Sequence, residues 1–218
     1  MEQYPPKRRV LEQFAIIAKA FGHEYRLELL ELVAQRERSV EALTQLTQLP
    51  VGSVSQHLQQ LRRAGLVSAR KEGKYVYYSL ADAEVLTLMA TLRRVAERNL
   101  AEVNQLVAQY FDDHQELDTL SPEQLLERLQ RDEVTLIDVR PPEEYASGHL
   151  PGAINIPVEE LEAHLQDLPA GQQVVAYCRG PFCALSRDAV RRLRQSGIDA
   201  TRLNQGFPEW KAEGLPIH

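Results

Sequence analysis

The two cysteines of this chain lie within six residues, in the segment Cys178-Arg-Gly-Pro-Phe-Cys183. An apolar run from Val174 to Tyr177 precedes the segment and predicts a buried strand, and a helical pattern starts at Ala184. The backbone N–H groups of a loop in this position converge at the helix N-terminus, which favours anions. The helix dipole and Arg179 should lower the pKa of the Cys178 thiol, making it a nucleophile near neutral pH.

We expect Cys178 to accept a sulfane sulfur and to hold it as a persulfide. The anion-binding loop around it would consist of Arg179, Gly180, Pro181, Phe182 and Ala184. Cys183 supplies a second thiol, which can attack a sulfurated or oxidised Cys178 and form a disulfide or a sulfur-bridged pair. That step should require the loop to move, because a disulfide tolerates only short Cα separations. The alternative is that Cys178 is a small apolar residue that caps a buried strand.

Two thiols are too few for a cysteine-based zinc site, and their spacing offers no disulfide framework. We therefore expect no metal and no other cofactor. Paired thiols in a reducing compartment instead indicate redox or sulfur chemistry.

A second group of residues with recognisable chemistry lies on the helical run 51–64. At ~100° per residue, Val54, Leu58 and Leu61 share one side, and the opposite side is rich in amide and basic groups. Gln can pair with adenine in the major groove, Ser with base edges or phosphates, and Arg with guanine or the DNA backbone. The residues expected to contact DNA are Ser53, Ser55, Gln56, His57, Gln59, Gln60, Arg62, Arg63, Arg70, Lys71 and Lys74. A solvated helix face and a lysine-protected edge hairpin are the alternative.

Three further helices and a hairpin would position this helix. Apolar stripes at helical spacing occupy 10–21 and 27–33, and Ser39 can cap a third helix at 40–47. Leu49-Pro50 breaks the third helix before the run 51–64, which Gly65 ends. Strands at 67–70 and 75–80 are joined by a glycine-containing loop typical of a hairpin. The pattern predicts a mainly α domain, with a helix-turn-helix followed by a β-wing.

An apolar stripe at spacings of three and four residues continues over 81–110 and predicts one long helix. A surface helix that packs only on its own domain seldom carries so long an apolar stripe. We therefore expect this face to pair with a second copy of the chain, with Asn99 as a polar residue that sets the register. The alternative is a long helix that covers its own core.

The acidic segment 112–116 is typical of a linker, which divides the chain into domains at 1–111 and 112–218. Ser121-Pro-Glu-Gln124 is a capped helix start. Beyond it we expect strands at 134–139, 174–177 and 200–203, a helical patch at 158–165 and a helix at 184–195. Strands that alternate with helices indicate an α/β domain with a central parallel sheet.

Length and charge agree with two domains that have different partners. The chain has 218 residues; its first 110 carry 15 Lys and Arg against 12 Asp and Glu, and the remainder carry 10 against 19. A uniformly acidic first half would have argued against nucleic acid. No apolar run approaches the ~18–20 residues of a membrane span, and MEQYPPKRRV at the start lacks the apolar stretch of a secretory signal. We expect a cytoplasmic protein with no membrane partner.

The first half resembles the ArsR/SmtB family of winged-helix repressors over roughly 10–110. The motifs that carry the resemblance are Phe21-Gly-His-Glu-Tyr-Arg-Leu-Glu-Leu-Leu30, Ser53-Val-Ser-Gln-His-Leu58, Leu61-Arg-Arg-Ala-Gly-Leu-Val67 and Glu72-Gly-Lys-Tyr-Val-Tyr-Tyr78. The resemblance implies a homodimer through the first and last helices of the domain, the 51–64 helix in the major groove of a double-stranded DNA operator, and DNA release when an inducer binds.

Three departures indicate that the signal enters elsewhere. Metal-sensing members place cysteines where this chain has Glu37-Arg-Ser-Val40, or Asp and His ligands on the last helix, and no histidine lies between His57 and His114. Members that sense sulfur directly use cysteines inside this domain, which has none.

The second half resembles a single-domain rhodanese over roughly 118–218. The motifs are Leu136-Ile-Asp-Val-Arg140, Glu144-Tyr145, Gly148-His-Leu-Pro-Gly-Ala-Ile-Asn-Ile-Pro157, the Cys178 loop and Gly206-Phe-Pro-Glu-Trp210. The resemblance implies chiefly structural roles for Asp138, Arg140 and His149. The usual loop has Gly three residues after the nucleophile and Arg five after it, where this chain has Pro181 and Cys183. Loss of that arginine should weaken binding of thiosulfate unless Arg179 or Arg187 substitutes.

Our leading hypothesis is a dimeric repressor whose rhodanese-like domain senses small sulfur species such as persulfide, polysulfide or thiosulfate. An active sulfurtransferase that works through a Cys178 persulfide is the alternative from the enzyme class. A third interpretation makes the rhodanese-like domain an inert interaction module beside an ordinary repressor.

Overall fold

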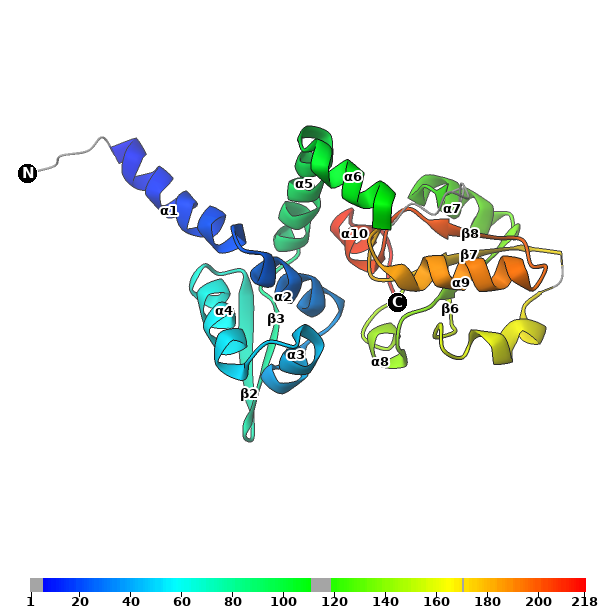
Figure 1. Cartoon of the computed structure of the whole chain (residues 1–218), viewed down its shortest axis with the longest axis horizontal. Helices are drawn as coiled ribbons and strands as arrows, with labels where there is room; N and C mark the ends of the chain where they lie inside the picture. Colours follow the sequence, from blue (N-terminus) through cyan, green and yellow to red (C-terminus); the bar gives the residue numbers. More distant parts are fainter. Residues whose placement is uncertain (1–5, 111–118, 170) are drawn as a thin grey trace, which may run out of the picture. The chain divides into compact units, whose positions relative to one another are not determined.

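The computed structural model describes residues 6–110, 119–169 and 171–218. The chain forms two compact units, divided between Val85 and Leu86 (Figure 1). The predicted linker at 112–116 lies outside the described residues. No helix in the described ranges is both long and apolar enough to cross a bilayer.

The first unit is mainly helical and carries an antiparallel sheet with the strand order β1-β3-β2. Its elements are α1 (Pro6–Phe21), α2 (Glu24–Gln35), β1 (Arg38–Ser39), α3 (Val40–Thr47), α4 (Val51–Arg63), β2 (Val67–Glu72) and β3 (Tyr75–Leu80). The predicted helix-turn-helix and wing are confirmed. The sequence does not predict β1, because two residues carry too little periodic signal.

Local signals begin and end the helices of this unit. The Ser39 hydroxyl accepts a hydrogen bond from a backbone amide in the first turn of α3 and caps it. Gln48, with φ of 58°, ends α3, and Gly65, with φ of 73°, follows α4. The apolar side of α4 is fully buried, as its pattern predicts, through Val54, Leu58 and Leu61.

The predicted single helix over 81–110 is wrong, because the segment forms two helices. α5 (Glu84–Asn99) and α6 (Ala101–Tyr110) are separated at Leu100. At the break, the Asn99 side-chain amide donates to the Val95 carbonyl at 2.8 Å. Across the break, the Asn104 side-chain amide donates to the Glu97 carbonyl at 3.0 Å. Side chains that bond nearby carbonyls compete with the backbone ladder. The Asn99 amide is thus engaged within its own chain.

The second unit contains a five-stranded parallel sheet in the order β4-β8-β7-β5-β6. After α5 and α6, its elements are β4 (Thr119–Leu120), α7 (Pro122–Gln130), β5 (Val134–Asp138), α8 (Pro142–Tyr145), β6 (Ile154–Asn155), the 3-10 helix η1 (Leu161–Asp167), β7 (Gln173–Tyr177), α9 (Ala184–Gln195), β8 (Ala200–Leu203) and α10 (Phe207–Ala212). The predicted α/β class with a parallel sheet is confirmed.

Alternate residues of the central strands enter two cores on opposite faces of this sheet. On β7, Val174 and Ala176 pack with α9 and η1. Val175 and Tyr177 pack with α7 and α10 on the other face (Figure 1). The end of β7, which the cysteine loop follows, is therefore held between two packed layers.

The helical patch predicted at 158–165 consists of a turn followed by the 3-10 helix η1, which continues to Asp167. Val158 and Leu161 are three residues apart, as are Leu165 and Leu168, and all four belong to one core. A repeat of three residues suits the tighter 3-10 helix.

Candidate sulfur site and nucleic-acid interface

The cysteine loop connects the end of β7 to the start of α9. Cys178 follows Tyr177 directly, and Cys183 is the N-cap of α9. The Cys183 amide donates to the Gly180 carbonyl at 3.1 Å and closes a turn inside the loop. The other predicted loop residues lie on this turn and at the helix start, in the order Pro181, Phe182 and Ala184. The structure thus brings the two thiols into one loop.

The pKa of the Cys178 thiol differs from the sequence-based prediction. It is 1% exposed, and its sulfur lies 3.2 Å from the Ser186 hydroxyl and 3.7 Å from the Gly180 carbonyl. Burial, followed by the hydrogen bond to the Cys183 thiol, raises the pKa of Cys178 well above its usual range. The expected lowering of the Cys178 pKa is therefore wrong, because exclusion of water outweighs the helix dipole.

Half-buried Cys183, rather than Cys178, has the lowered pKa. The Cys178 thiol donates a hydrogen bond to the Cys183 sulfur, and the backbone N–H groups of Leu185 and Arg179 donate to it as well. The hydrogen bond from Cys178 is the largest influence, and together these donors lower the pKa of Cys183 to about 6 against the opposing effect of burial. Near neutral pH the two thiols hold one negative charge between them, mainly on Cys183.

Arg179 is held beside the loop by a buried carboxylate. Its Nε lies 2.9 and 3.1 Å from the two Glu144 oxygens, and its Nη2 lies 2.7 Å from one of them. Glu144, on α8, is 1% exposed. This two-pronged pair fixes the guanidinium and neutralises much of its charge. Arg187, the other expected substitute for the missing loop arginine, is buried on α9.

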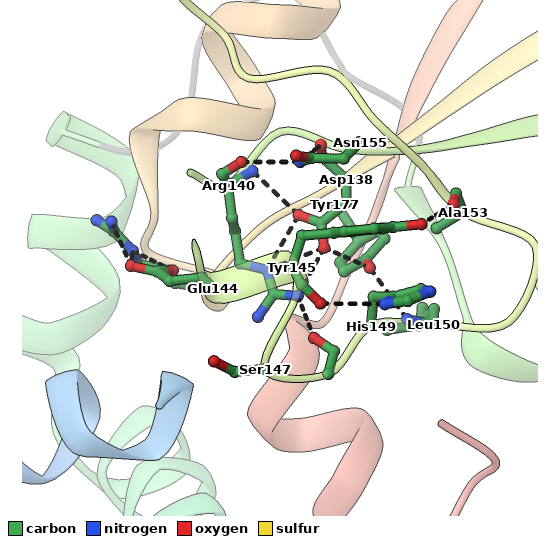
Figure 2. A network of polar contacts seen from close by, with 12 residues as sticks. Asp138, Arg140, Glu144, Tyr145, Ser147, His149, Leu150, Ala153, Asn155 and Tyr177 are labelled. Carbon is green, nitrogen blue, oxygen red and sulfur yellow. Dashed lines mark hydrogen bonds and ion pairs between the residues drawn. The ribbon is translucent and has the colours of Figure 1, made fainter. Parts of the chain in front are cut away.

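A second polar network fixes the end of β7 (Figure 2). The Tyr177 hydroxyl donates to Asp138 Oδ2 at 2.6 Å and accepts from the Leu150 amide at 3.0 Å. The same carboxylate binds the Arg140 guanidinium at 2.6 to 3.1 Å, and Arg140 Nη2 also donates to the Gly148 carbonyl. Because Tyr177 directly precedes Cys178, this network sets where the loop begins.

His149 belongs to the same side of the domain and packs as a structural residue. Its ring stacks on Tyr145 with a centroid separation of 3.7 Å, and its Nδ1 lies 3.0 Å from the Tyr145 carbonyl. Its backbone exchanges two hydrogen bonds with His218. This arrangement agrees with the structural role that the rhodanese resemblance implies.

Gly206 holds the start of α10 against the cysteine loop. A Cβ at Gly206 would lie 2.2 Å from the Gly180 nitrogen and 2.3 Å from the Arg179 carbonyl carbon. The next residue, Phe207, donates its amide to the Cys178 carbonyl at 3.0 Å. Only a residue without a side chain allows this approach, so Gly206 shapes the loop from outside.

Ser186, Glu144 and Gly206 were not among the predicted site residues. Glu144 and Gly206 do lie in two of the rhodanese motifs, which were the available signal for them. Ser186 carries no signal, because a serine in the first turn of a helix is common and only the fold aims its hydroxyl at the Cys178 sulfur.

In the first unit, the predicted DNA contacts separate into outward and inward groups. Ser53 and Ser55 on α4 are half-buried, and the exposed predicted residues of α4 and the wing are Gln56, Gln59, Arg62, Arg63, Arg70, Lys71 and Lys74. Arg70 is ion-paired with Glu37 at 2.6 Å and also with Glu72. The charge of Arg70 is therefore partly neutralised before any phosphate approaches.

Gln60 and His57 contact their own domain. Gln60 Oε1 accepts a hydrogen bond of 2.8 Å from the buried Arg26, whose Nε donates to the Ala20 carbonyl. The His57 ring lies 4.6 Å from the His23 ring, and burial is the main cause that lowers its pKa. These two side chains help to hold α4 on the domain. Arg26, which sequence reasoning missed, ties α4 to the end of α1.

Comparison with known proteins covers both units. Residues 23–69 match the description "Bacterial regulatory protein, arsR family", and residues 121–213 match the rhodanese-like domain. Over 211 residues the chain is 43% identical to the HTH-type transcriptional regulator Rv0324 of Mycobacterium tuberculosis, covering 97% of this chain and 92% of that protein. The chain belongs to the ArsR family. This ArsR-family member is a transcriptional regulator with a rhodanese-like domain at its C-terminal end.

Each half of the ArsR-family regulator also has separate relatives. Over 100 residues it is 34% identical to a "Sulfurtransferase" of Allochromatium vinosum, covering 45% of this chain and 92% of that protein. Among solved structures, the homodimeric winged helix-turn-helix DNA-binding domain Mb0332 of Mycobacterium bovis is 39% identical, covers 46% of this chain and 93% of that one, and has a TM-score of 0.42.

Proposed function

We propose that this regulator is a homodimeric repressor of a double-stranded DNA operator that senses reactive sulfur through its cysteine loop. The observation that carries the proposal is the placement of two free thiols in one loop, with Cys183 at the N-terminus of α9, where hydrogen bonds lower its pKa to about 6. A thiolate there is a nucleophile toward a persulfide or polysulfide, and a second thiol within reach can turn the captured sulfur into a disulfide.

The outward face of α4 and the wing support DNA binding. Gln56 and Gln59 are exposed amides that suit base edges in the major groove. Arg62, Arg63 and the wing lysines are exposed cations that suit phosphates. The apolar side of α4 packs in the domain core, so the polar side is the one that can enter the major groove of DNA.

Exposed apolar side chains on two helices support the dimer. On α1, Val10, Leu11 and Phe14 are between 51% and 63% exposed, and on α5, Leu88, Leu92 and Val95 are between 40% and 42% exposed. Apolar patches of this kind mark interaction surfaces. A second copy of the chain is the occupant proposed here.

A coupling free energy of ~1–3 kcal/mol between the loop and the operator would change DNA affinity by roughly 5- to 150-fold. We would measure anisotropy of a fluorescent duplex that the full-length protein selects from a random library, before and after glutathione persulfide. The wild type should lose at least about fivefold in affinity, and the double variant Cys178→Ser/Cys183→Ser should not respond. Equal affinities of the treated and untreated wild type would refute sulfur sensing and favour the inert module.

An active sulfurtransferase is the second candidate, favoured by the similarity to the Allochromatium vinosum sulfurtransferase. The Arg179–Glu144 pair argues against thiosulfate as its donor, because the cation next to the thiols is already occupied. Turnover of thiosulfate with cyanide should therefore be weak in the wild type and should rise in Glu144→Gln, which releases Arg179. Strong wild-type turnover that Cys178→Ser abolishes would favour the enzyme instead.

A further inference from the structure

The two thiols of the loop have different access to solvent. Cys178 occupies the position that the rhodanese resemblance gives to the nucleophile, yet it is 1% exposed, whereas Cys183 is half-buried. We infer that Cys183 is the thiol that first takes a sulfane sulfur, and that Cys178 is the thiol that then displaces it. This inference rests on the proposed sulfur sensing and reverses the roles of the two cysteines within it.

Hydrogen bonding favours the same order. The Cys183 sulfur receives the Cys178 thiol and the backbone N–H groups of Leu185 and Arg179, at the N-terminus of a 12-residue helix. Cys178 is surrounded by the Ser186 hydroxyl and by the carbonyls of Gly180 and Cys183. Those carbonyl oxygens accept hydrogen bonds and suit a protonated thiol. The Ser186 hydroxyl and a backbone hydrogen bond at Gly180 lower the pKa of Cys178, but burial and the neighbouring Cys183 outweigh them, so Cys178 keeps its proton while Cys183 carries the charge.

In the first step, the donor is a low-molecular-weight persulfide, R–S–SH. The Cys183 thiolate attacks its outer sulfur, the bond between the two donor sulfurs breaks, and R–S⁻ leaves with the electron pair. The products are Cys183–S–SH and a thiolate, so one sulfur atom has moved. The resting charge of Cys183, which raises the pKa of Cys178, is removed in this step.

In the second step, Cys178 attacks the inner sulfur of the Cys183 persulfide. The bond between that sulfur and the outer one breaks, the outer sulfur leaves with the electron pair, and the Cys178 proton passes to it. The products are a Cys178–Cys183 disulfide and H₂S. The two cysteines are oxidised by two electrons, and the sulfane sulfur is reduced to sulfide.

Peptide mapping of the full-length protein tests the order. Trypsin cleaves after Arg179 and Arg187, so Cys178 and Cys183 fall on different peptides. The wild type would be treated briefly with substoichiometric glutathione persulfide at pH 7, trapped with iodoacetamide, digested and analysed by mass spectrometry. The early extra sulfur should lie on the Cys183 peptide, and the disulfide between the two peptides should follow. An early persulfide on the Cys178 peptide would overturn the inference.

The single variants give a second readout. Cys178→Ser should accept one sulfur on Cys183 and retain it, because no thiol remains to displace it. Cys183→Ser should take up sulfur at least about tenfold more slowly, since Cys178 is buried and protonated. Equal uptake rates of the two variants would also overturn the inference.

The experiments distinguish a failure of the inferred order of the two thiols from a failure of the proposed sulfur sensing. If Cys178 reacts first and DNA affinity still responds to persulfide, only the order of the thiols is wrong. If neither peptide gains sulfur, sulfur sensing through this loop and the order inferred here are both refuted.

Discussion

The pH dependence of cysteine alkylation is a direct test of the electrostatics of the loop. With a pKa of about 6, Cys183 would be ionised to about one tenth at pH 5 and about nine tenths at pH 7. An ordinary thiol with a pKa near 8.5 would be ionised to only about 3% at pH 7. The Cys183 peptide should therefore be alkylated about tenfold faster at pH 7 than at pH 5, with a plateau above pH 7.5.

The assay is iodoacetamide labelling of the full-length protein over pH 5 to 9, with rates read from the separate Cys183 and Cys178 peptides. The Cys183 rate should have its midpoint near pH 6, whereas the Cys178 rate should still be rising at pH 9. Cys178→Ser is the matched control. Since a serine hydroxyl donates to the Cys183 sulfur as a thiol does, the midpoint should stay well below 8.5. A wild-type Cys183 midpoint above pH 8 would refute the reasoning.

The same pKa has a consequence for folding stability. Cys183 has a lower pKa in the folded chain than the ~8.5 of an unfolded one, so its ionisation stabilises the fold fully above pH ~8.5. The contribution declines as pH falls and is lost below about pH 6. The raised pKa of Cys178 opposes it at high pH, because there the unfolded chain ionises more readily.

Three further outcomes follow from contacts in the two units. Gly206→Ala should destabilise the rhodanese-like domain by ~1–3 kcal/mol in urea unfolding, because its Cβ would meet the loop backbone, whereas Gly52→Ala, whose Cβ meets nothing within 4 Å, should not. Ser186→Ala should raise the pKa of Cys178 further and lengthen the lifetime of the Cys183 persulfide in time-resolved mass spectrometry; an unchanged lifetime would contradict a role for this hydroxyl. Lys71→Ala should lower DNA affinity and reduce the salt slope by about 1, and Arg70→Ala should do so less, because Arg70 is already ion-paired; equal losses would contradict that difference.

Much of the fold was predictable because the signals are local. The Ser39 cap, the capping box of Ser121 and Gln124, and the bounds of α9 follow from residue types and helical spacing alone. The break at Leu100 was not predictable from periodicity, because the apolar stripe continues through it. The helical patch that contains η1 was predicted, but its 3-10 type was not, since spacings of three residues fit either helix type.

The sequence by itself determined the two-domain plan, the helix-turn-helix with its wing, and the placement of both thiols in one loop between a strand and a helix. Only the tertiary structure decided which thiol carries the charge. Ionisation depends on water, hydrogen bonds and charges in three dimensions: burial and the Ser186 hydroxyl act on Cys178, and the backbone N–H groups of Leu185 and Arg179 act on Cys183. Residues from distant segments hold the loop that presents these groups, Glu144 by its pair with Arg179 and Gly206 by its close approach to the loop backbone. For the same reason, the helical projection of α4 could not show that Gln60 already binds Arg26.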